Sequence, residues 1–248
     1  MRYELRRLEI LAALYPDHPN HGVRYVALKD AALACPRANN VLVLGCGRGL
    51  VEYLLTEGWH CTSVDISEKQ IEAAREINRF KNNRTFYVDD LFHVRSIPAN
   101  SQFNLVIISE VIEHLDNDRG ALRVAYDRLE PGGHFILTVP NQGRFHNALR
   151  KMFGREPFLM TSDHVREYTV NHVSELLKLT GFVIEGWRGV WFEFPRPGLC
   201  ERFIDPSSRL RAFLAWLFPH WATYILLVCH KPATAVVAVD AAARAMAG

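Results

Sequence analysis

Short apolar runs alternate along the chain with segments whose apolar residues recur at helical spacing. Apolar runs of this length predict buried strands, and the periodic segments between them predict helices. Alternating strands and helices predict an α/β fold with a mostly parallel, doubly wound sheet and right-handed crossovers. The predicted strands are 40–44, 61–67, 85–89, 103–109 and 133–140, and the predicted helices between them are 51–58, 67–82 and 120–129.

The two ends of the chain depart from this alternation. Two predicted helices at 2–14 and 22–34 precede the first strand and form an N-terminal helical extension, 1–36. After residue 141 the pattern becomes irregular, and a helix at 169–181 and a strand within 182–194 follow. Residues 233–248 are rich in alanine and have no obvious core partner, so we expect a poorly ordered or weakly helical tail.

Residues 212–229 contain no Asp, Glu, Lys or Arg. This uncharged stretch is long enough to span a membrane as a helix. Pro219 and His220 interrupt this stretch, however, and proline breaks a helix interior. The alternative is an apolar helix at 208–218 followed by a buried strand at 222–229. We favour the second interpretation and expect no transmembrane span.

Composition and charge narrow the functional class. The chain has 248 residues, of which 49% are hydrophobic and 23% charged, and this excludes a disordered chain. A formal net charge of +2 gives no sign of a nucleic-acid partner. The five cysteines are odd in number and form no CxxC pair, which argues against disulfides or a thiolate zinc site. With no signal peptide expected, we predict a cytoplasmic protein.

A glycine loop follows the first predicted strand. Gly45, Gly47 and Gly49 allow the backbone to turn tightly and to approach a ligand at the carboxyl edge of a parallel sheet. Asp65 ends the second strand twenty residues after Gly45, where a carboxylate can accept hydrogen bonds from a ribose. Asp89 and Asp90 end the third strand on the same edge. Together these residues predict a nucleotide-type site.

Several motifs in order resemble class I S-adenosylmethionine (SAM)-dependent methyltransferases, in particular the ubiquinone-biosynthesis O-methyltransferase-like group (methyltransferase type 11/23). The resemblance covers about residues 38–188 and rests on VLVLGCGRG, SVDIS, VDDL, FNLVIISEVIEHL, LEPGGHFILTVPN and DHVREYTVNHVSELLKLTGF. It implies a seven-stranded Rossmann-like sheet that ends in an antiparallel hairpin, formed here by 182–194 and 222–230. It also implies one catalytic domain, 37–232, with an insertion at about 195–221.

The resemblance also implies a SAM site. The loop would line the methionine and ribose part, Asp65 with Ile66 would hold the ribose, and Asp90 with Leu91 would meet the adenine. Ser109 and Glu110 would border the methyl group. One departure is Val43, which stands where the family usually carries an acid near the SAM amino group. The loop residues implied to bind SAM are Gly45, Cys46, Gly47 and Gly49.

Glu110, Glu113 and His114 are spaced i, i+3, i+4, so a helix entered at about Glu110 would place all three on one face. The resemblance suggests that Glu110, Glu113 and His114 hold Mg²⁺ or Mn²⁺, with His164 as a further ligand. A second interpretation makes His114 or His164 a general base for a substrate hydroxyl, with Glu110 beside it. A third is that the motif is only a helix start, with no metal. Methyl transfer itself needs mainly alignment.

Other residues have weaker signals. Tyr168 and Arg166 suit either the acceptor pocket or a surface or packing role. The basic cluster from Arg144 to Arg155 could meet an anionic substrate, but a solvated face explains it better. The helix at 208–218 is too apolar for an exposed face. It would cap the acceptor pocket, pair with another subunit in a homodimer, or lie on a membrane surface.

Three functions therefore remain open. We expect O-methylation of a small apolar or glycosidic acceptor. The alternatives are 2′-O-methylation of RNA with a divalent metal, which the low net charge disfavours, and a SAM-binding protein without catalysis.

Overall fold

The structure is a computed structural model that describes residues 21–194 and 209–233. The predicted helix at 2–14, the first part of the insertion at 195–208 and the alanine-rich tail from 234 onward lie outside the described residues.

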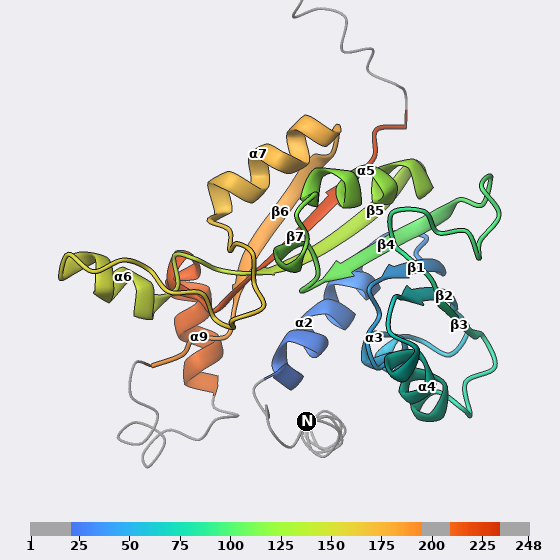
Figure 1. The fold of residues 1–248 in the computed structure, drawn as a ribbon, viewed down its shortest axis with the longest axis horizontal. Helices are drawn as coiled ribbons and strands as arrows, with labels where there is room; N and C mark the ends of the chain where they lie inside the picture. Colours follow the sequence, from blue (N-terminus) through green and yellow to red (C-terminus); the bar gives the residue numbers. More distant parts are fainter. Residues whose placement is uncertain (1–20, 195–208, 234–248) are drawn as a thin grey trace, which may run out of the picture.

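A single seven-stranded sheet forms the centre of the described fold (Figure 1), with strand order β3-β2-β1-β4-β5-β7-β6. β1 to β5 pair in parallel, whereas β7 lies antiparallel between β5 and β6. The mostly parallel sheet and the C-terminal antiparallel hairpin are thus confirmed. The strands are β1 (Asn40–Leu44), β2 (His60–Asp65), β3 (Arg84–Val88), β4 (Phe103–Ser109), β5 (Leu129–Pro140), β6 (Val183–Val190) and β7 (Tyr224–His230).

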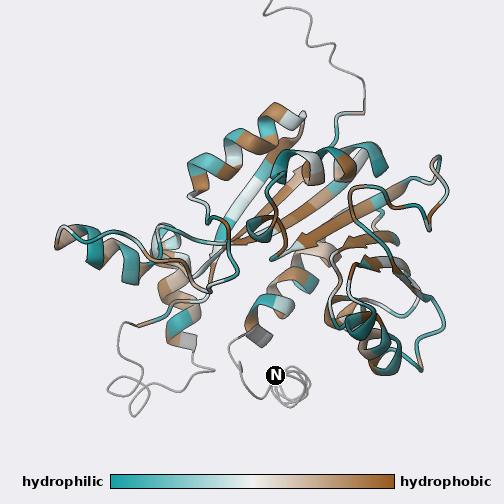
Figure 2. Cartoon of the chain, in the orientation of Figure 1, coloured by the Kyte–Doolittle hydropathy of each residue, from teal (hydrophilic) through white to brown (hydrophobic). Residues whose placement is uncertain are grey.

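Helices cover both faces of the sheet. α5 (Asp118–Arg128) and α7 (Val170–Thr180) pack on one face, and α2 (His21–Ala34), α3 (Leu50–Leu54) and α4 (Glu68–Ile77) pack on the other (Figure 1). Strands covered on both faces need apolar side chains at every position, which explains the continuous runs in the sequence. The inner strands of the sheet are accordingly brown along most of their length in Figure 2, whereas β6 at the edge of the sheet is paler.

Two of the predicted helices are shorter than predicted, and the structure contains one further helix that the sequence did not predict. α3 stops at Leu54 and α4 at Ile77, while α6 (Phe145–Met152) forms in a stretch that seemed irregular. The prediction of a helix that begins at about Glu110 is wrong, because only a single 3₁₀ turn, η1 (Ile112–His114), forms there. The Glu110 N–H still donates to the Thr138 carbonyl, so the backbone follows the sheet to Glu110 and then turns with a φ of 54°.

The uncharged stretch divides as predicted. α9 (Arg209–Leu217) is followed by the 3₁₀ turn η2 (Pro219–Trp221), and β7 enters the sheet core. Pro219 opens η2 because proline fits the first position of a helical turn but not a helix interior. Within the described residues, every helix is too short or too polar to cross a bilayer.

Candidate functional site

A cavity of about 890 Å³ opens at the carboxyl ends of β1, β2 and β4. This is the edge of a doubly wound sheet at which ligands bind, because the strand order reverses there. Its lining comes from α2, the loops after β1, β2 and β3, the turn after β4, the segment 160–164, and residues next to β6 and β7.

The glycine loop forms one wall of the cavity and is fixed by Asp65. The Gly47 N–H donates to Asp65 Oδ2 at 2.8 Å, and the Ser67 N–H donates to Oδ1 at 2.9 Å. Gly45 has a φ of 74°, and a Cβ at this position would lie 2.5 Å from Val111 Cγ2. Glycine is therefore required there both by backbone conformation and by space.

Most residues that the resemblance implies for SAM line this cavity. The exception is Gly49, which has a φ of 70° and faces Asn78 and Ala74, so its role is to start α3. Val43 also lines the cavity, with an apolar side chain where an acid was usual. The residues that do line it are Gly45, Cys46, Gly47, Asp65, Ile66, Asp90, Leu91 and Ser109.

Arg24 reaches the cavity from α2 and was not anticipated from the sequence. Its guanidinium lies 3.1 Å from Glu110 Oε2; the Arg24 side chain is buried and that of Glu110 is mostly buried. Burial raises the pKa of Glu110, and the charge of Arg24 opposes that rise. Arg24 is the one Lys or Arg among the described residues that line the cavity.

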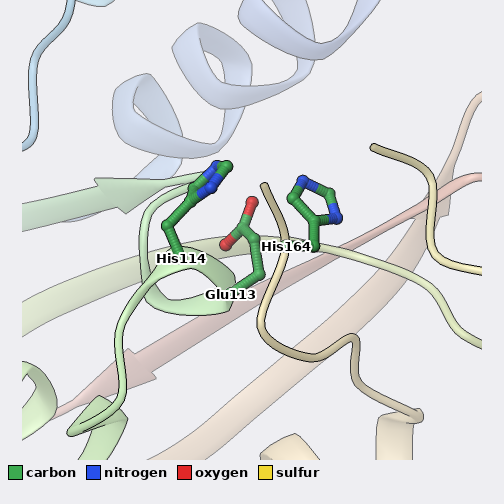
Figure 3. Close-up of side chains that lie close together, drawn as sticks. All are labelled: Glu113, His114 and His164. Atoms are coloured by element: carbon green, nitrogen blue, oxygen red, sulfur yellow. The ribbon is translucent and has the colours of Figure 1, made fainter. Parts of the chain in front are cut away.

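Glu113, His114 and His164 also line this cavity and lie close together (Figure 3). One potential ligand atom from each lies within 4.8 Å of the others. Glu113 is fully buried, and neither carboxylate oxygen has a hydrogen-bond partner within the described part of the chain. Burial, and next the charge of Glu110, raise the pKa of Glu113 well above its ordinary value.

The unpaired carboxylate and the two imidazoles form a donor set that suits a divalent cation. The cluster differs from the predicted ligand set at one position. Glu110 was expected beside Glu113 and His114, but its carboxylate pairs with Arg24, while His164 completes the group.

Further contacts orient the two histidines. His164 Nδ1 lies 3.2 Å from Glu167 Oε1, and Glu167 also forms a buried ion pair with Arg144. His114 Nδ1 lies 3.2 Å from the Asp163 carbonyl oxygen. With Nδ1 engaged, each ring can offer Nε2 to the cavity. The expectation that Arg144 belongs to a solvated face is wrong, because it is buried against Glu167 and the Phe158 carbonyl.

Tyr168 and Arg166 serve packing and do not line the cavity. The Tyr168 hydroxyl and the Arg166 guanidinium both donate to Asp118 Oδ2, at 2.9 and 2.8 Å. The Tyr168 hydroxyl also lies 3.2 Å from the Ile112 carbonyl, so this cluster supports the turn that carries Glu113 and His114.

Sequence reasoning also missed two further groups of lining residues. One group depends on how β6 and β7 end beside α2, and the other comes from the segment just before His164, and no local motif marks either. They are Tyr25, Trp191, Glu193, Thr223 and Tyr224 in the first group and Met160, Thr161 and Asp163 in the second.

Comparison with known proteins places the chain among methyltransferases. A family described as a methyltransferase domain matches residues 20–185. The ubiquinone biosynthesis O-methyltransferase of Rickettsia bellii (strain OSU 85-389) is 26% identical over 156 residues, covering 60% of this chain and 64% of that protein. The chain therefore spans less than two thirds of that relative. The protein of the same name from Vibrio vulnificus (strain YJ016) is 23% identical over 205 residues, covering 76% and 86%.

Solved structures share the fold at low sequence identity. The N-methyltransferase NodS from Bradyrhizobium japonicum WM9, in complex with S-adenosylhomocysteine, has a TM-score of 0.59 and 15% identity, covering 87% of this chain and 89% of that chain. The [4+2]-cyclase SpnF has a TM-score of 0.60 and 18% identity, covering 86% and 82%. Since one neighbour is named a methyltransferase and the other a cyclase, the fold alone does not decide the reaction.

Proposed function

Because this chain belongs to the methyltransferase domain family, we propose that it transfers the methyl group of SAM to an oxygen atom of a small acceptor. One observation carries the proposal: a single cavity joins the glycine loop to the cluster of Glu113, His114 and His164. Cofactor and acceptor can therefore meet without any rearrangement of the sheet.

The cofactor would lie along the loop after β1. The Gly45–Gly47 backbone would pass the methionine part, and Asp65 and Asp90 would accept hydrogen bonds from the ribose and the adenine. The SAM carboxylate needs a cation, and Arg24 is the guanidinium available in this lining. Glu110, its partner, also lines the cavity and would accept a hydrogen bond from the SAM ammonium group, a contact that Val43 does not provide.

The acceptor would lie between the cofactor and the Glu–His–His cluster. In the transfer, the acceptor oxygen forms a bond to the methyl carbon while the S–CH₃ bond breaks, and S-adenosylhomocysteine leaves. His114 or His164 accepts the hydroxyl proton, because a neutral imidazole can act as a general base near pH 7. Alignment of the two reactants can contribute about 7–11 kcal/mol to lowering the barrier.

As an alternative role for the same cluster, we propose that Glu113, His114 and His164 would hold Mg²⁺ or Mn²⁺, in which case the two histidines would be ligands and would not accept the hydroxyl proton. The unpaired Glu113 carboxylate supports this proposal, since a buried carboxylate without a partner is costly. A bound divalent ion would lower the pKa of an acceptor hydroxyl and orient it.

Two experiments test the function. Isothermal titration calorimetry with SAM and S-adenosylhomocysteine should give a saturable heat, and folded protein without heat would contradict the proposal. Labelled SAM incubated with fractionated cell extract should then transfer label to small molecules. Label in RNA would favour the alternative 2′-O-methylation, and binding without any transfer would favour a SAM-binding protein that lacks catalysis.

The variant His114→Ala tests the role of the Glu113–His114–His164 cluster independently of SAM binding. We expect SAM affinity within about twofold of wild type and a rate lowered about 10²–10⁴-fold, as for loss of a general base. His172→Ala is a matched control, because His172 is an exposed histidine of α7 that does not line the cavity. A His114→Ala enzyme with the wild-type rate across pH would remove this cluster from the mechanism.

A further inference from the structure

α9 has an inverted arrangement of polar and apolar side chains. Arg211 is buried, with its guanidinium 4.9 Å from the Trp191 ring centroid and 5.5 Å from that of Phe194. On the outside of the same helix, Phe213 and Trp216 are 51% and 72% exposed. A surface helix ordinarily buries its apolar residues and exposes its arginine. An external partner is the simplest reason for this inversion.

A second apolar projection lies beside α9. α6 extends away from the sheet on the side of α9 (Figure 1), and Gly154, with a φ of 67°, lets the chain reverse just after it. This reversal leaves Met152 and Phe153 at the tip, 69% and 72% exposed. The base of α6 is joined to the α9 region through Phe145, whose ring lies 5.8 Å from that of Trp221.

We call the exposed surface of residues 150–159 and 210–221 the α6–α9 face. It contains 10 of the 17 large hydrophobic side chains that are exposed in the described residues, including six of the seven exposed Phe and Trp. Scattered exposed hydrophobics are normal, but a concentration of this kind marks an interaction surface. The ten are Met152, Phe153, Phe158, Leu159, Leu210, Phe213, Trp216, Leu217, Phe218 and Trp221.

Charge identifies the kind of partner. Residues 150–159 contain three Lys or Arg residues and one acid, Glu156, so this short segment carries a net charge of +2, as much as the whole 248-residue chain, and residues 212–221 contain no Asp or Glu that would offset it. Arg150, Lys151 and Arg155 directly flank the exposed tip of α6. In a symmetric dimer the face would meet its own copy, so these positive charges would repel. An anionic lipid surface instead attracts them, and its interface favours Phe and Trp.

We therefore propose that the α6–α9 face binds the surface of an anionic phospholipid bilayer. The chain enters the cavity lining directly from this face, at Met160, so bilayer contact would bring the cavity next to the lipid headgroups. Trp191 and Glu193 line the cavity, while the alternate residues Phe192 and Phe194 pack in the apolar layer beneath α9. The face and the cavity thus share one stretch of backbone.

Vesicle co-sedimentation of the full chain tests the proposal. We expect binding to phosphatidylcholine vesicles that contain phosphatidylglycerol, weak binding to pure phosphatidylcholine, and release by salt, because electrostatic attraction is screened. Phe153→Ser with Trp216→Ser should weaken binding at least ~10-fold, as expected from the loss of two interfacial aromatics. Phe80→Ser is a matched control, because Phe80 is an 83% exposed phenylalanine that follows α4, away from this face.

The charge reversal Lys151→Glu with Arg155→Glu tests the electrostatic part. It should abolish the preference for anionic vesicles, whereas Arg119→Glu with Lys178→Glu, on exposed positions of α5 and α7, should not. Circular dichroism and melting temperature check folding for every variant.

Two outcomes would overturn the inference: equal binding of wild type and the aromatic variant, or no vesicle binding together with a dimer that the aromatic variant dissociates. The assay contains no SAM and no acceptor, so a negative result leaves the proposed methyl transfer untouched.

Discussion

At the scale of single residues, buried carboxylates separate structural from functional roles. Glu52 and Glu113 are both fully buried, but Glu52 accepts a hydrogen bond from the Ser63 hydroxyl at 2.6 Å, while Glu113 has no partner within the described residues. Glu52 lies outside the cavity lining, whereas Glu113 belongs to it. The two therefore predict different responses to the same Glu→Gln change.

Glu52 should make stability depend on pH. Burial raises its pKa from 4.5 to about 7. Between pH 4.5 and pH 7 the folded protein therefore holds a proton on Glu52 that the unfolded chain has released. Stability should then fall as pH rises from about 4.5 to about 7 and remain level above, by roughly 3 kcal/mol for a shift of this size. Glu52→Gln should remove this contribution from the pH dependence of denaturant unfolding measured from pH 5 to 8, whereas the contributions of Glu110 and Glu113, whose pKa values burial also raises, should remain. The exposed Glu57→Gln should keep it, and an unchanged slope in Glu52→Gln would contradict the assignment.

Glu113→Gln should lower the activity of the protein without lowering its stability. A neutral amide removes a buried, unpaired carboxylate, so the free energy of unfolding at pH 7 should be equal to or above that of wild type. Activity should fall by about 10²-fold or more, on the scale of a lost metal ligand or proton-transfer partner. The exposed Glu72→Gln is the control. If Mn²⁺ raises the melting temperature of Glu113→Gln as much as that of wild type, Glu113 is not a ligand.

At the scale of elements, Asn141 joins the end of β5 to the turn before β7. Its side-chain amide donates to the His220 and Ala222 carbonyls at 2.9 and 2.7 Å, and its Oδ1 accepts from the Gly143 N–H at 2.8 Å. Asn141 is 1% exposed, so all three bonds form away from water. Because this junction lies between the cavity and α9, it fixes the position of both.

Asn141→Leu should therefore destabilise the protein by about 2–5 kcal/mol, because it leaves buried backbone groups without partners. Chemical unfolding provides the measurement. Asn171→Leu, at an exposed position of α7, is the control and should lie within about 0.5 kcal/mol of wild type. A small effect of Asn141→Leu would mean that the η2–β7 junction is held mainly by packing.

The sequence predicted the elements that depend on local pattern. β1, β4 and β7 are apolar because helices cover both faces of the sheet, and a run of consecutive apolar residues shows this in the sequence. Gly45 is needed because the backbone there is left-handed, and the glycines that follow β1 show this turn. Each of these signals lies within a few neighbouring residues. The Glu113–His114–His164 cluster, by contrast, depends on a contact across fifty residues. Helical spacing wrongly favoured Glu110 as a ligand, because the chain remains with the sheet at that residue.

At the scale of the whole molecule, the N-terminal extension contributes to the site. α2 packs against the face of the sheet formed partly by β6 and β7 and carries Arg24 into the cavity. Periodicity shows that a face of this helix is buried, but it cannot show what a buried arginine meets. The extension and the sheet are therefore one functional unit.

Arg24→Met should weaken S-adenosylhomocysteine binding by about 10–100-fold, as expected for a lost charge-assisted contact to the ligand carboxylate. Because this change also leaves Glu110 buried and unpaired, the double variant Arg24→Met with Glu110→Gln is the necessary comparison. Calorimetry on both distinguishes the two roles. Affinity that returns to the wild-type value in the double variant would show that Arg24 acts only by neutralising Glu110.

The strand order has a consequence for synthesis of the protein. Of the strands in the described residues, β7 is the last to leave the ribosome, yet it lies between β5 and β6 and pairs with both. Until Tyr224–His230 has emerged, β5 and β6 each present an unpaired strand edge, and such edges promote aggregation. A nascent chain arrested before residue 224 should therefore depend on chaperones far more than one released seven residues later.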